Sequence, residues 1–177
     1  MKLIYQIPDQ LYYIQNFLDQ KTYQGIHDAI FKQRKKINLH SSKGIWDDTL
    51  INNIVPPERV TISDYPPFEK LKVLTRLNQF YQLKDITEMT TNIHFMKKGS
   101  GINWHDDSTW KYGATFYVNR RWGTQNGGEL MFHSENGHGF IPIVGNSLVI
   151  IKAPINHKVN PVLSPVIPRI SIQMFIK

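Results

Sequence analysis

Three residues in the second half of the chain have side chains that could share one metal ion. His105 and Asp107 are separated by a single residue, and in extended backbone such residues point to the same face of a strand. His157 lies much later, in another strand-like segment. Two imidazoles and one carboxylate on one face of an octahedron leave the opposite positions open for exchangeable ligands. The spacing therefore predicts a metal site that also binds small molecules.

The available ligand types favour iron at this site. The chain contains no cysteine, which excludes disulfides, zinc–thiolate sites and iron–sulfur clusters. Two histidines and one carboxylate with open positions are typical of non-haem Fe(II) oxygenases. Arg169 offers, in a later strand-like segment, a planar guanidinium suited to gripping a carboxylate. Each feature alone is common, but their order together indicates an iron site with an anion-binding arginine.

The segments that hold these residues belong to a series of predicted strands. After residue 85, short apolar or alternating runs follow one another, separated by Gly, Asn and Pro. This pattern predicts a mainly β (α+β) fold, a double-stranded β-helix or jelly roll, braced by N-terminal helices. The eight predicted strands are residues 90–97, 102–106, 113–119, 128–133, 138–142, 147–152, 156–163 and 168–176.

The last of these strands has two different faces. One face is wholly aliphatic and needs an apolar partner, which we expect to be the helical layer. The other face carries an arginine and two hydrogen-bonding groups, as expected of a strand that lines a polar pocket. The aliphatic face consists of Ile170, Ile172, Met174 and Ile176, and the polar face of Arg169, Ser171, Gln173 and Phe175.

The N-terminal part is predicted to be mostly helical. Residues 2–7 are predicted to form a short edge strand. Apolar residues at helical spacing predict a short helix over 10–19, a longer helix over 22–36 and a third over 68–83. The polar composition of residues 38–66, with its glycine and prolines, predicts a long loop with little regular structure. We expect one domain over residues 1–177, in which 1–88 support a catalytic jelly-roll core at 89–177.

Composition narrows the class of protein. The 177 residues are 41% hydrophobic and carry a net charge of +7, which indicates a globular protein with a basic surface. No apolar run has the length of a signal peptide or the ~18 residues of a membrane span, so we expect a cytoplasmic protein without a membrane partner. A basic pocket mouth would favour anionic small molecules or acidic peptides. No nucleic-acid-binding motif is present, and the oligomeric state stays open.

The motifs around the candidate residues have a recognisable order. A glycine-bearing turn precedes His105, a strand with Tyr-Val-Asn and a nearby Trp follows Asp107, and a Gly-Gly-Glu-Leu turn comes next. In this order, residues 92–177 resemble the 2-oxoglutarate and Fe(II)-dependent dioxygenases, specifically the prolyl 4-hydroxylase-like branch. The matching positions are Gly99, Gly101, Trp104 to Asp107, Phe116 to Trp122, Gly127 to Leu130, Pro142, Gly145 to Val149, His157 to Val162 and Arg169 to Ser171.

The resemblance implies a role for each matching residue. His105, Asp107 and His157 would bind Fe(II), with no catalytic residue beyond these ligands. Arg169 would pair with the distal carboxylate of the cosubstrate 2-oxoglutarate, Tyr117 would hydrogen-bond the same carboxylate, and Ser171 is a candidate for that pocket. The implied reaction uses O2, converts 2-oxoglutarate to succinate and hydroxylates a substrate, with ascorbate as a candidate reductant.

The sequence is compatible with several functions. The leading hypothesis is hydroxylation of a prolyl residue in a peptide or protein, and the alternative is a dioxygenase of a free amino acid or small metabolite. A cupin-like metal-binding protein without oxygenase activity would leave Arg169 and Tyr117 unexplained. Nucleic-acid demethylases of this superfamily carry a second arginine where this chain has Phe175. Phe95 also stands where relatives often have a tyrosine, which predicts one hydrogen bond fewer to the cosubstrate.

Overall fold

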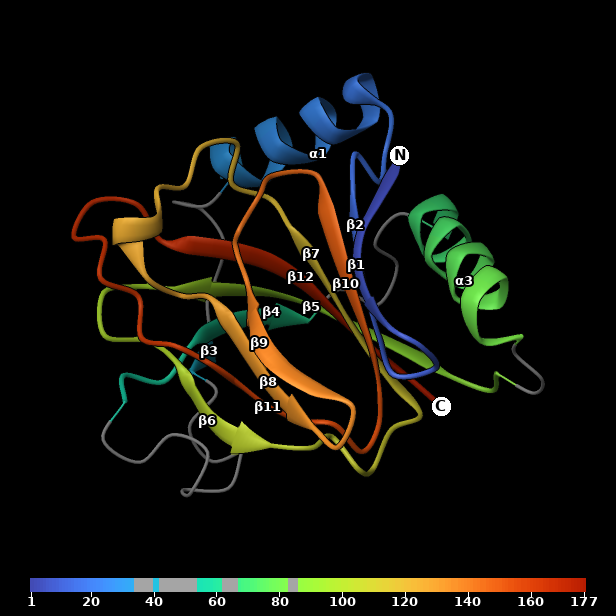
Figure 1. The fold of residues 1–177 in the computed structure, drawn as a ribbon. Helices are drawn as coiled ribbons and strands as arrows, with labels where there is room; N and C mark the ends of the chain where they lie inside the picture. Colours follow the sequence, from blue (N-terminus) through green and yellow to red (C-terminus); the bar gives the residue numbers. More distant parts are fainter. Residues whose placement is uncertain (34–39, 42–53, 62–66, 83–85) are drawn as a thin grey trace.

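Two antiparallel β-sheets pack against each other, and two helices cover the outer side of the larger sheet (Figure 1). The computed structural model describes residues 1–33, 40–41, 54–61, 67–82 and 86–177. The predicted two-sheet, jelly-roll architecture is confirmed. Among the described residues, no helix combines the length and apolar character that a membrane crossing requires.

The large sheet contains eight strands, of which β7 and β12 occupy central positions. In spatial order its strands are β1 (Lys2–Ile7), β2 (Leu11–Gln15), β10 (Ser147–Lys152), β7 (Tyr112–Tyr117), β12 (Arg169–Ile176), β5 (Met89–Met96), β4 (Glu58–Thr61) and β3 (His40–Ser41). The small sheet contains β6 (Ile102–His105), β11 (Asn156–Val159), β8 (Leu130–Ser134) and β9 (Gly137–Ile141), in that order. All eight strands predicted after residue 85 are confirmed, with ends shifted by a few residues.

The outer core lies between the large sheet and the helices α1 (Gln20–Gln33) and α3 (Pro67–Tyr81). The aliphatic face of β12 belongs to this core, as predicted from its alternation. Tyr23 and Ile26 of α1 and Val73 and Leu77 of α3 are buried in the same cluster. Burial of apolar surface here anchors the large sheet, so the opposite face of β12 is free to carry polar groups.

The inner core fills the space between the two sheets at one end. It joins side chains of the large sheet, such as Leu11 and Val149, to side chains of the small sheet, such as Leu130 and Phe132. The polar face of β12 continues from this core toward the other end, where a cavity opens. The packing thus divides the interior into an apolar part that holds the sheets together and a polar part that holds the candidate site.

Two N-terminal predictions are wrong. The segment predicted as a helix over 10–19 contains strand β2, which pairs with β1 on one side and β10 on the other. Its residues Leu11 to Ile14 are all buried, and a short run that is apolar on both faces fits helical and strand periods equally well. The predicted loop at 38–66 includes strands β3 and β4, although much of that segment lies outside the described residues.

One buried asparagine joins the N-terminal strands to the jelly roll. The Asn146 side-chain oxygen accepts a hydrogen bond from the Leu18 backbone N–H, and its amide donates to the Leu18 carbonyl, both at 2.9 Å. Asn146 is 4% exposed and has a φ of 59°, a left-handed conformation that asparagine tolerates better than most residues. This residue therefore satisfies two buried backbone groups of Leu18.

We predict that Asn146→Ala lowers the free energy of unfolding by about 2–4 kcal/mol, because it leaves both buried groups of Leu18 without a partner. Urea denaturation measures this change. The matched control is Asn78→Ala on the exposed surface of α3, which we expect to change stability by no more than about 0.5 kcal/mol. Equal stability of the two variants would contradict the bridging role of Asn146.

Candidate metal centre

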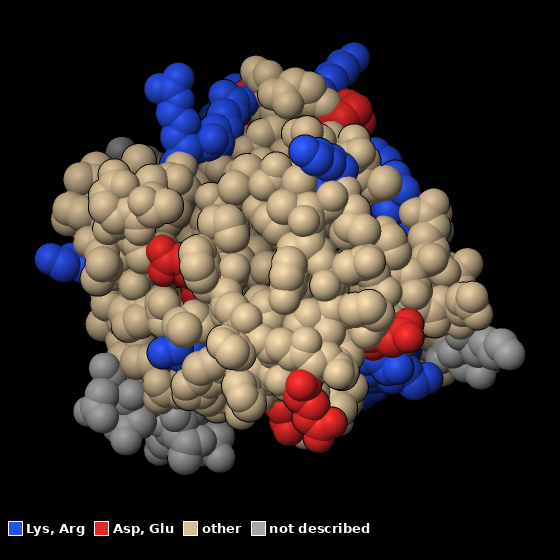
Figure 2. All heavy atoms as spheres, in the orientation of Figure 1, with Lys and Arg blue, Asp and Glu red and all other residues tan. Residues whose placement is uncertain are grey.

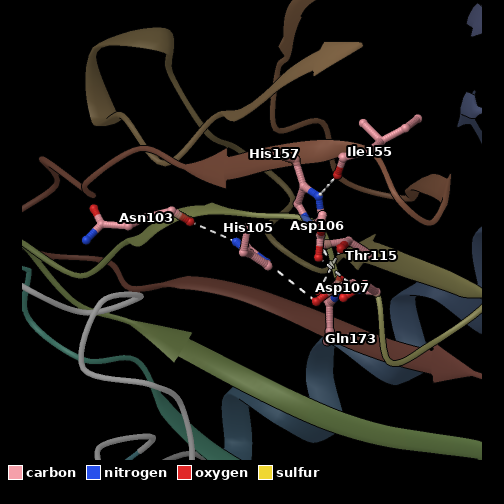
Figure 3. A network of polar contacts seen from close by, with 9 residues as sticks. Asn103, His105, Asp106, Asp107, Thr115, Ile155, His157 and Gln173 are labelled. Carbon is pink, nitrogen blue, oxygen red and sulfur yellow. Dashed lines mark hydrogen bonds and ion pairs between the residues drawn. The ribbon is translucent and has the colours of Figure 1, made fainter.

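The predicted ligand residues meet where β6 pairs with β11 (Figure 3). His105 and His157 are direct partners in the antiparallel register, and their ring centroids lie 4.2 Å apart. The Asp107 carboxylate lies between them, with Oδ1 3.6 Å from His105 Nε2 and Oδ2 3.4 Å from His157 Nε2. One ligand atom from each residue lies within 4.8 Å of the others. An ion bonded at about 2.1 Å to nitrogen and oxygen holds its ligands up to about 4 Å apart, so both distances from Asp107 to the histidines fit one metal.

The hydrogen bonds of the two imidazoles orient their free nitrogens toward the carboxylate. His105 Nδ1 lies 2.8 Å from the carbonyl oxygen of Asn103, and His157 Nδ1 lies 2.8 Å from that of Ile155. A carbonyl oxygen only accepts hydrogen bonds, so each Nδ1 carries the proton. In the neutral rings each Nε2 then presents a lone pair to Asp107. Two lone pairs and a carboxylate that face one another repel unless a cation lies among them.

The electrostatics of the cluster favour the metal-binding forms of His105 and Asp107. Burial lowers the pKa of His105, and the neighbouring His157 lowers it further, so the neutral imidazole is favoured. Burial alone would raise the pKa of Asp107. The two neighbouring histidines, His157 first, outweigh that effect and hold the pKa of Asp107 below its ordinary value. A neutral imidazole and an ionised carboxylate are the protonation states that a metal requires.

Asp107 reaches the histidines by a different route from the predicted one. We expected an extended strand through both residues, but β6 ends at His105 and Asp107 has a φ of 52° in the following turn. The carboxylate then comes close to Gly113 of β7. A Cβ atom at Gly113 would lie 3.2 Å from Asp107 Oδ2, which is tighter than ordinary van der Waals contact. The absence of a side chain at Gly113 gives the carboxylate its room.

Beside the three residues lies a cavity of about 660 Å³. Its floor is the polar face of the large sheet, where the Thr115 hydroxyl and the Gln173 side-chain oxygen are 2.6 Å apart (Figure 3). Asn92 and His94 of β5 line the same cavity, and the pockets of ligand-binding proteins have comparable volumes. The site therefore has space for a small molecule next to the metal ligands.

Arg169 and Tyr117 lie on the same inner face of the large sheet and are almost fully buried. The Arg169 guanidinium donates to Ser171 Oγ at 3.0 Å and lies 5.1 Å from the centre of the Tyr117 ring. Among the described residues, Arg169 Nε and the Tyr117 hydroxyl have no hydrogen-bond partner, and no carboxylate pairs with Arg169. Burial lowers the pKa of Arg169 and raises that of Tyr117. A buried cation that forms no ion pair among the described residues, with only the charge of Glu129 acting on it from farther away, indicates a place for an anion.

Neighbouring residues fix the place of Arg169. The Asn119 side chain donates to the Pro168 carbonyl at 3.0 Å and accepts from the Ile170 N–H at 2.7 Å, which clamps the backbone on both sides of the arginine. A Cβ at Gly128 would lie 2.9 Å from Arg169 Cδ. These contacts give a physical reason for Asn119 in the Tyr-Val-Asn run, which clamps the backbone, and for Gly128 in the Gly-Gly-Glu-Leu turn, which leaves room for the Arg169 side chain.

Three other residues near the candidate site, Asp106, Phe95 and His94, have different surroundings. Asp106 is exposed, and its carboxylate accepts a hydrogen bond from the Ser108 N–H at 3.0 Å. Phe95 was counted as the position of a missing tyrosine, but it packs in the outer core, and Met96 is the neighbour that contacts Arg169. His94 is buried on the cavity side, where burial, Arg169 and Arg59 lower its pKa to about 3.

Sequence reasoning missed two features of the site. The role of Gly113 depends on the contact between β7 and the turn after β6, and no local pattern signals it. Arg59 lines the cavity from β4, within the segment predicted to be a loop. The alternation in residues 58–61 is too short to predict a strand without its partner β5.

Comparisons with known proteins agree with this geometry. Residues 91–177 match the model of the 2OG-Fe(II) oxygenase superfamily, and no curated protein sequence matches the chain significantly. A prolyl-4-hydroxylase from Pseudomonas putida is 15% identical, with a TM-score of 0.76 over 95% of this chain and 92% of that chain. A Trichoplax adhaerens prolyl hydroxylase in complex with a hypoxia-inducible-factor peptide is 16% identical, with a TM-score of 0.78 over 95% and 83%.

A different enzyme shares the fold as well. The non-haem α-ketoglutarate-dependent epimerase SnoN from nogalamycin biosynthesis is 8% identical, with a TM-score of 0.69 over 96% of this chain and 78% of that chain. The fold therefore accompanies more than one reaction among the similar structures. The resemblance expected from the motifs is confirmed at the level of the superfamily: residues 91–177 of this chain are a 2OG-Fe(II) oxygenase domain.

Proposed function

We propose that the protein is an Fe(II)- and 2-oxoglutarate-dependent dioxygenase in which His105, Asp107 and His157 hold the iron. The convergence of two Nε2 lone pairs on one carboxylate carries this proposal. A charged histidine–aspartate cluster is the competing explanation. Burial and the neighbouring histidine lower the pKa of His105, which disfavours the charged form of that ring and favours a bound metal cation among the three residues.

Arg169, Tyr117 and Ser171 are the proposed binding site for the distal carboxylate of 2-oxoglutarate. A carboxylate there would give the buried Arg169 its missing counter-charge and the Tyr117 hydroxyl an acceptor. Ser171 Oγ already contacts the guanidinium and so fixes its direction. Bound iron, 2-oxoglutarate and O2 together supply oxidative decarboxylation to succinate and hydroxylation of a C–H bond. The chain's own contribution is to orient the two small molecules and to shield them within the two-sheet interior.

The proposed substrate is a prolyl residue in a peptide or protein. Two of the similar structures are prolyl hydroxylases, and one of them is in complex with a peptide. A free amino acid or small metabolite is the alternative, which the likeness to SnoN supports. A cupin-like protein without oxygenase activity would have no use for a buried, uncompensated Arg169. Ascorbate is proposed as a reductant that maintains Fe(II).

A nucleic-acid substrate is disfavoured. Figure 2 shows Lys and Arg side chains dispersed around the margin of this face, while its centre carries few charges. Among the described residues on this face, the basic side chains therefore form no continuous surface of the kind that a phosphate backbone binds. Phe175 stands where the nucleic-acid demethylases of the superfamily carry a second arginine, and its apolar ring lines the cavity.

We predict that Asp107→Ala lowers iron affinity at least about a hundred-fold and abolishes 2-oxoglutarate-dependent succinate release. The ligand itself is lost, and even contacts around a ligand change affinity by about ten- to a hundred-fold. Equilibrium dialysis followed by metal analysis measures the affinity. Asp106→Ala is the matched control and retains iron, because the Asp106 carboxylate bonds the Ser108 N–H instead. Retention of iron by Asp107→Ala would reject the assigned site.

We predict that Arg169→Leu raises the dissociation constant of 2-oxoglutarate by about ten- to a hundred-fold, the loss expected for charge-assisted hydrogen bonds. Iron still binds, because Arg169 contacts none of the three metal ligands through a hydrogen bond or ion pair among the described residues. Calorimetric titration of the iron-loaded, oxygen-free protein separates the two affinities. An unchanged 2-oxoglutarate affinity would exclude Arg169 from the cosubstrate site.

Gly113→Ala is predicted to weaken iron binding by about ten-fold without unfolding the protein. Its Cβ would press on Asp107 Oδ2 and displace the carboxylate from the shared position. The same metal analysis measures the effect, with thermal unfolding as the control for stability. Wild-type iron affinity in this variant would show that the carboxylate does not depend on the gap at Gly113.

A further inference from the structure

A second cavity, of about 340 Å³, lies on the face of the small sheet opposite to the metal ligands. Leu130 and Phe132 of β8 belong to the inner core, so Glu129 and Met131, which alternate with them, point to the outer face. Glu129 and Met131 line the second cavity, whereas Leu130 lines the first. No described residue lines both cavities, so the proposed functions of the metal ligands and of Arg169 do not use the second one.

Apolar side chains form most of the wall of this second cavity. Phe140 of β9 is 63% exposed, more than any other aromatic residue in the described part of the chain. The Trp122 indole N–H donates to the Gly127 carbonyl at 2.8 Å, which holds that ring in place. A solvent-exposed ring beside an apolar cavity is a surface that a ligand would cover. The apolar residues that line the cavity are Trp122, Met131, Phe140, Pro142 and Ile143.

Glu129 is the one charged residue among the described residues that line this cavity. It is partly buried, and its carboxylate forms no hydrogen bond or ion pair with a described residue. Its charge acts on Arg169 through the sheet, but the two side chains form no ion pair. The Asn160 N–H bonds the Glu129 carbonyl at 2.9 Å and so fixes the backbone there. A carboxylate beside apolar rings favours an ammonium or guanidinium group that carries apolar neighbours.

The cavity lies next to an edge strand, which favours a peptide over a free amine. β9 is the last strand of the small sheet, and among the described residues its backbone pairs with β8 alone. An extended peptide that adds to this edge would place every second side chain on the outer face, where Phe140 lies. Such a peptide would lie two strand spacings, about 10 Å, from Glu129, a distance that a glutamate and a long basic side chain span together.

The register between β8 and β9 specifies the spacing of the two recognised side chains. Leu130 is opposite Ile141, so Glu129 is level with Pro142, two residues after Phe140. Side chains two residues apart in an extended peptide point to the same face. A basic side chain level with Glu129 and an apolar one level with Phe140 would therefore be two positions apart.

We propose that the outer face of the small sheet is a docking site for an extended segment of a partner protein, in which a lysine or arginine is two positions from an apolar residue. The basic group pairs with Glu129, and the apolar side chain packs against Phe140 and Trp122. The chain has a net charge of +7, so Glu129 itself, and not the overall field, attracts the cation. This docking site is separate from the dioxygenase chemistry proposed for the inner cavity.

The test measures binding of a short peptide to the full chain by fluorescence anisotropy. The probe is a labelled, end-blocked heptapeptide in which a central lysine is flanked on each side by serine, leucine and glycine, in that order. A second peptide carries acetyl-lysine in place of lysine, and hexylamine serves as the free-amine competitor. The variant is Glu129→Gln, and the matched control is Glu135→Gln, which removes the same charge from the exposed turn between β8 and β9.

We expect the wild type and Glu135→Gln to bind the lysine peptide about ten-fold more tightly than the acetyl-lysine peptide. In Glu129→Gln this ratio falls to about one. Phe140→Ala weakens binding of both peptides by about ten-fold and leaves their ratio unchanged, because the ring contacts the apolar side chain. Thermal unfolding of each variant confirms that the fold is retained.

Three results would overturn this inference. One is the absence of peptide binding by the wild type at millimolar concentration, or a preference for lysine that survives in Glu129→Gln. Another is competition by hexylamine at the affinity of the lysine peptide, which would make a free amine the ligand. The third is a dimer in sedimentation velocity that dissociates in Phe140→Ala, which would make a second copy of the chain the occupant. None of these measurements depends on iron or 2-oxoglutarate, so the dioxygenase assignment is tested separately.

Discussion

The antiparallel register between β6 and β11 is the constraint on which the candidate site depends. It sets His105 directly opposite His157, and each ring bonds a backbone carbonyl two residues earlier in the chain. A shift of one residue in either strand would turn its imidazole to the opposite face. The inner core packs on the same small sheet and so stabilises this register. The position of the two histidines among the candidate metal ligands is therefore a consequence of sheet packing.

The central strand β12 connects stability with function through its two faces. Its aliphatic face is buried against the helices, and its polar face holds Arg169, Ser171 and Gln173 toward the interior. Burial of a guanidinium without an acidic partner is unfavourable by several kcal/mol, a cost that the apolar side of the same strand offsets. A ligand that neutralises Arg169 would then bind to a group already oriented by Asn119 and Ser171. Such preorganisation lowers the entropic cost of binding.

The parts of this molecule that sequence reasoning predicted correctly are those governed by local periodicity. Strict alternation in residues 169–176 predicted both faces of β12, and turn residues separated the eight strands. The helix prediction for the segment that forms β2, Leu11–Gln15, was wrong because a strand buried on both faces lacks the alternation that identifies strands. Contacts between distant segments, such as Gly113 with Asp107 or Arg59 with Asn92, depend on register and were beyond any sequence pattern. The three proposed metal ligands can be identified from the sequence because residue type and order carry their signal.

The central claim is that His105, Asp107 and His157 form an iron site that also binds 2-oxoglutarate. The most direct measurement is the visible spectrum of the oxygen-free protein after addition of Fe(II) and then 2-oxoglutarate. The account predicts a charge-transfer band that appears only when both are present and saturates at one equivalent of each. A spectrum without this band, at concentrations that saturate both ligands, would contradict the account.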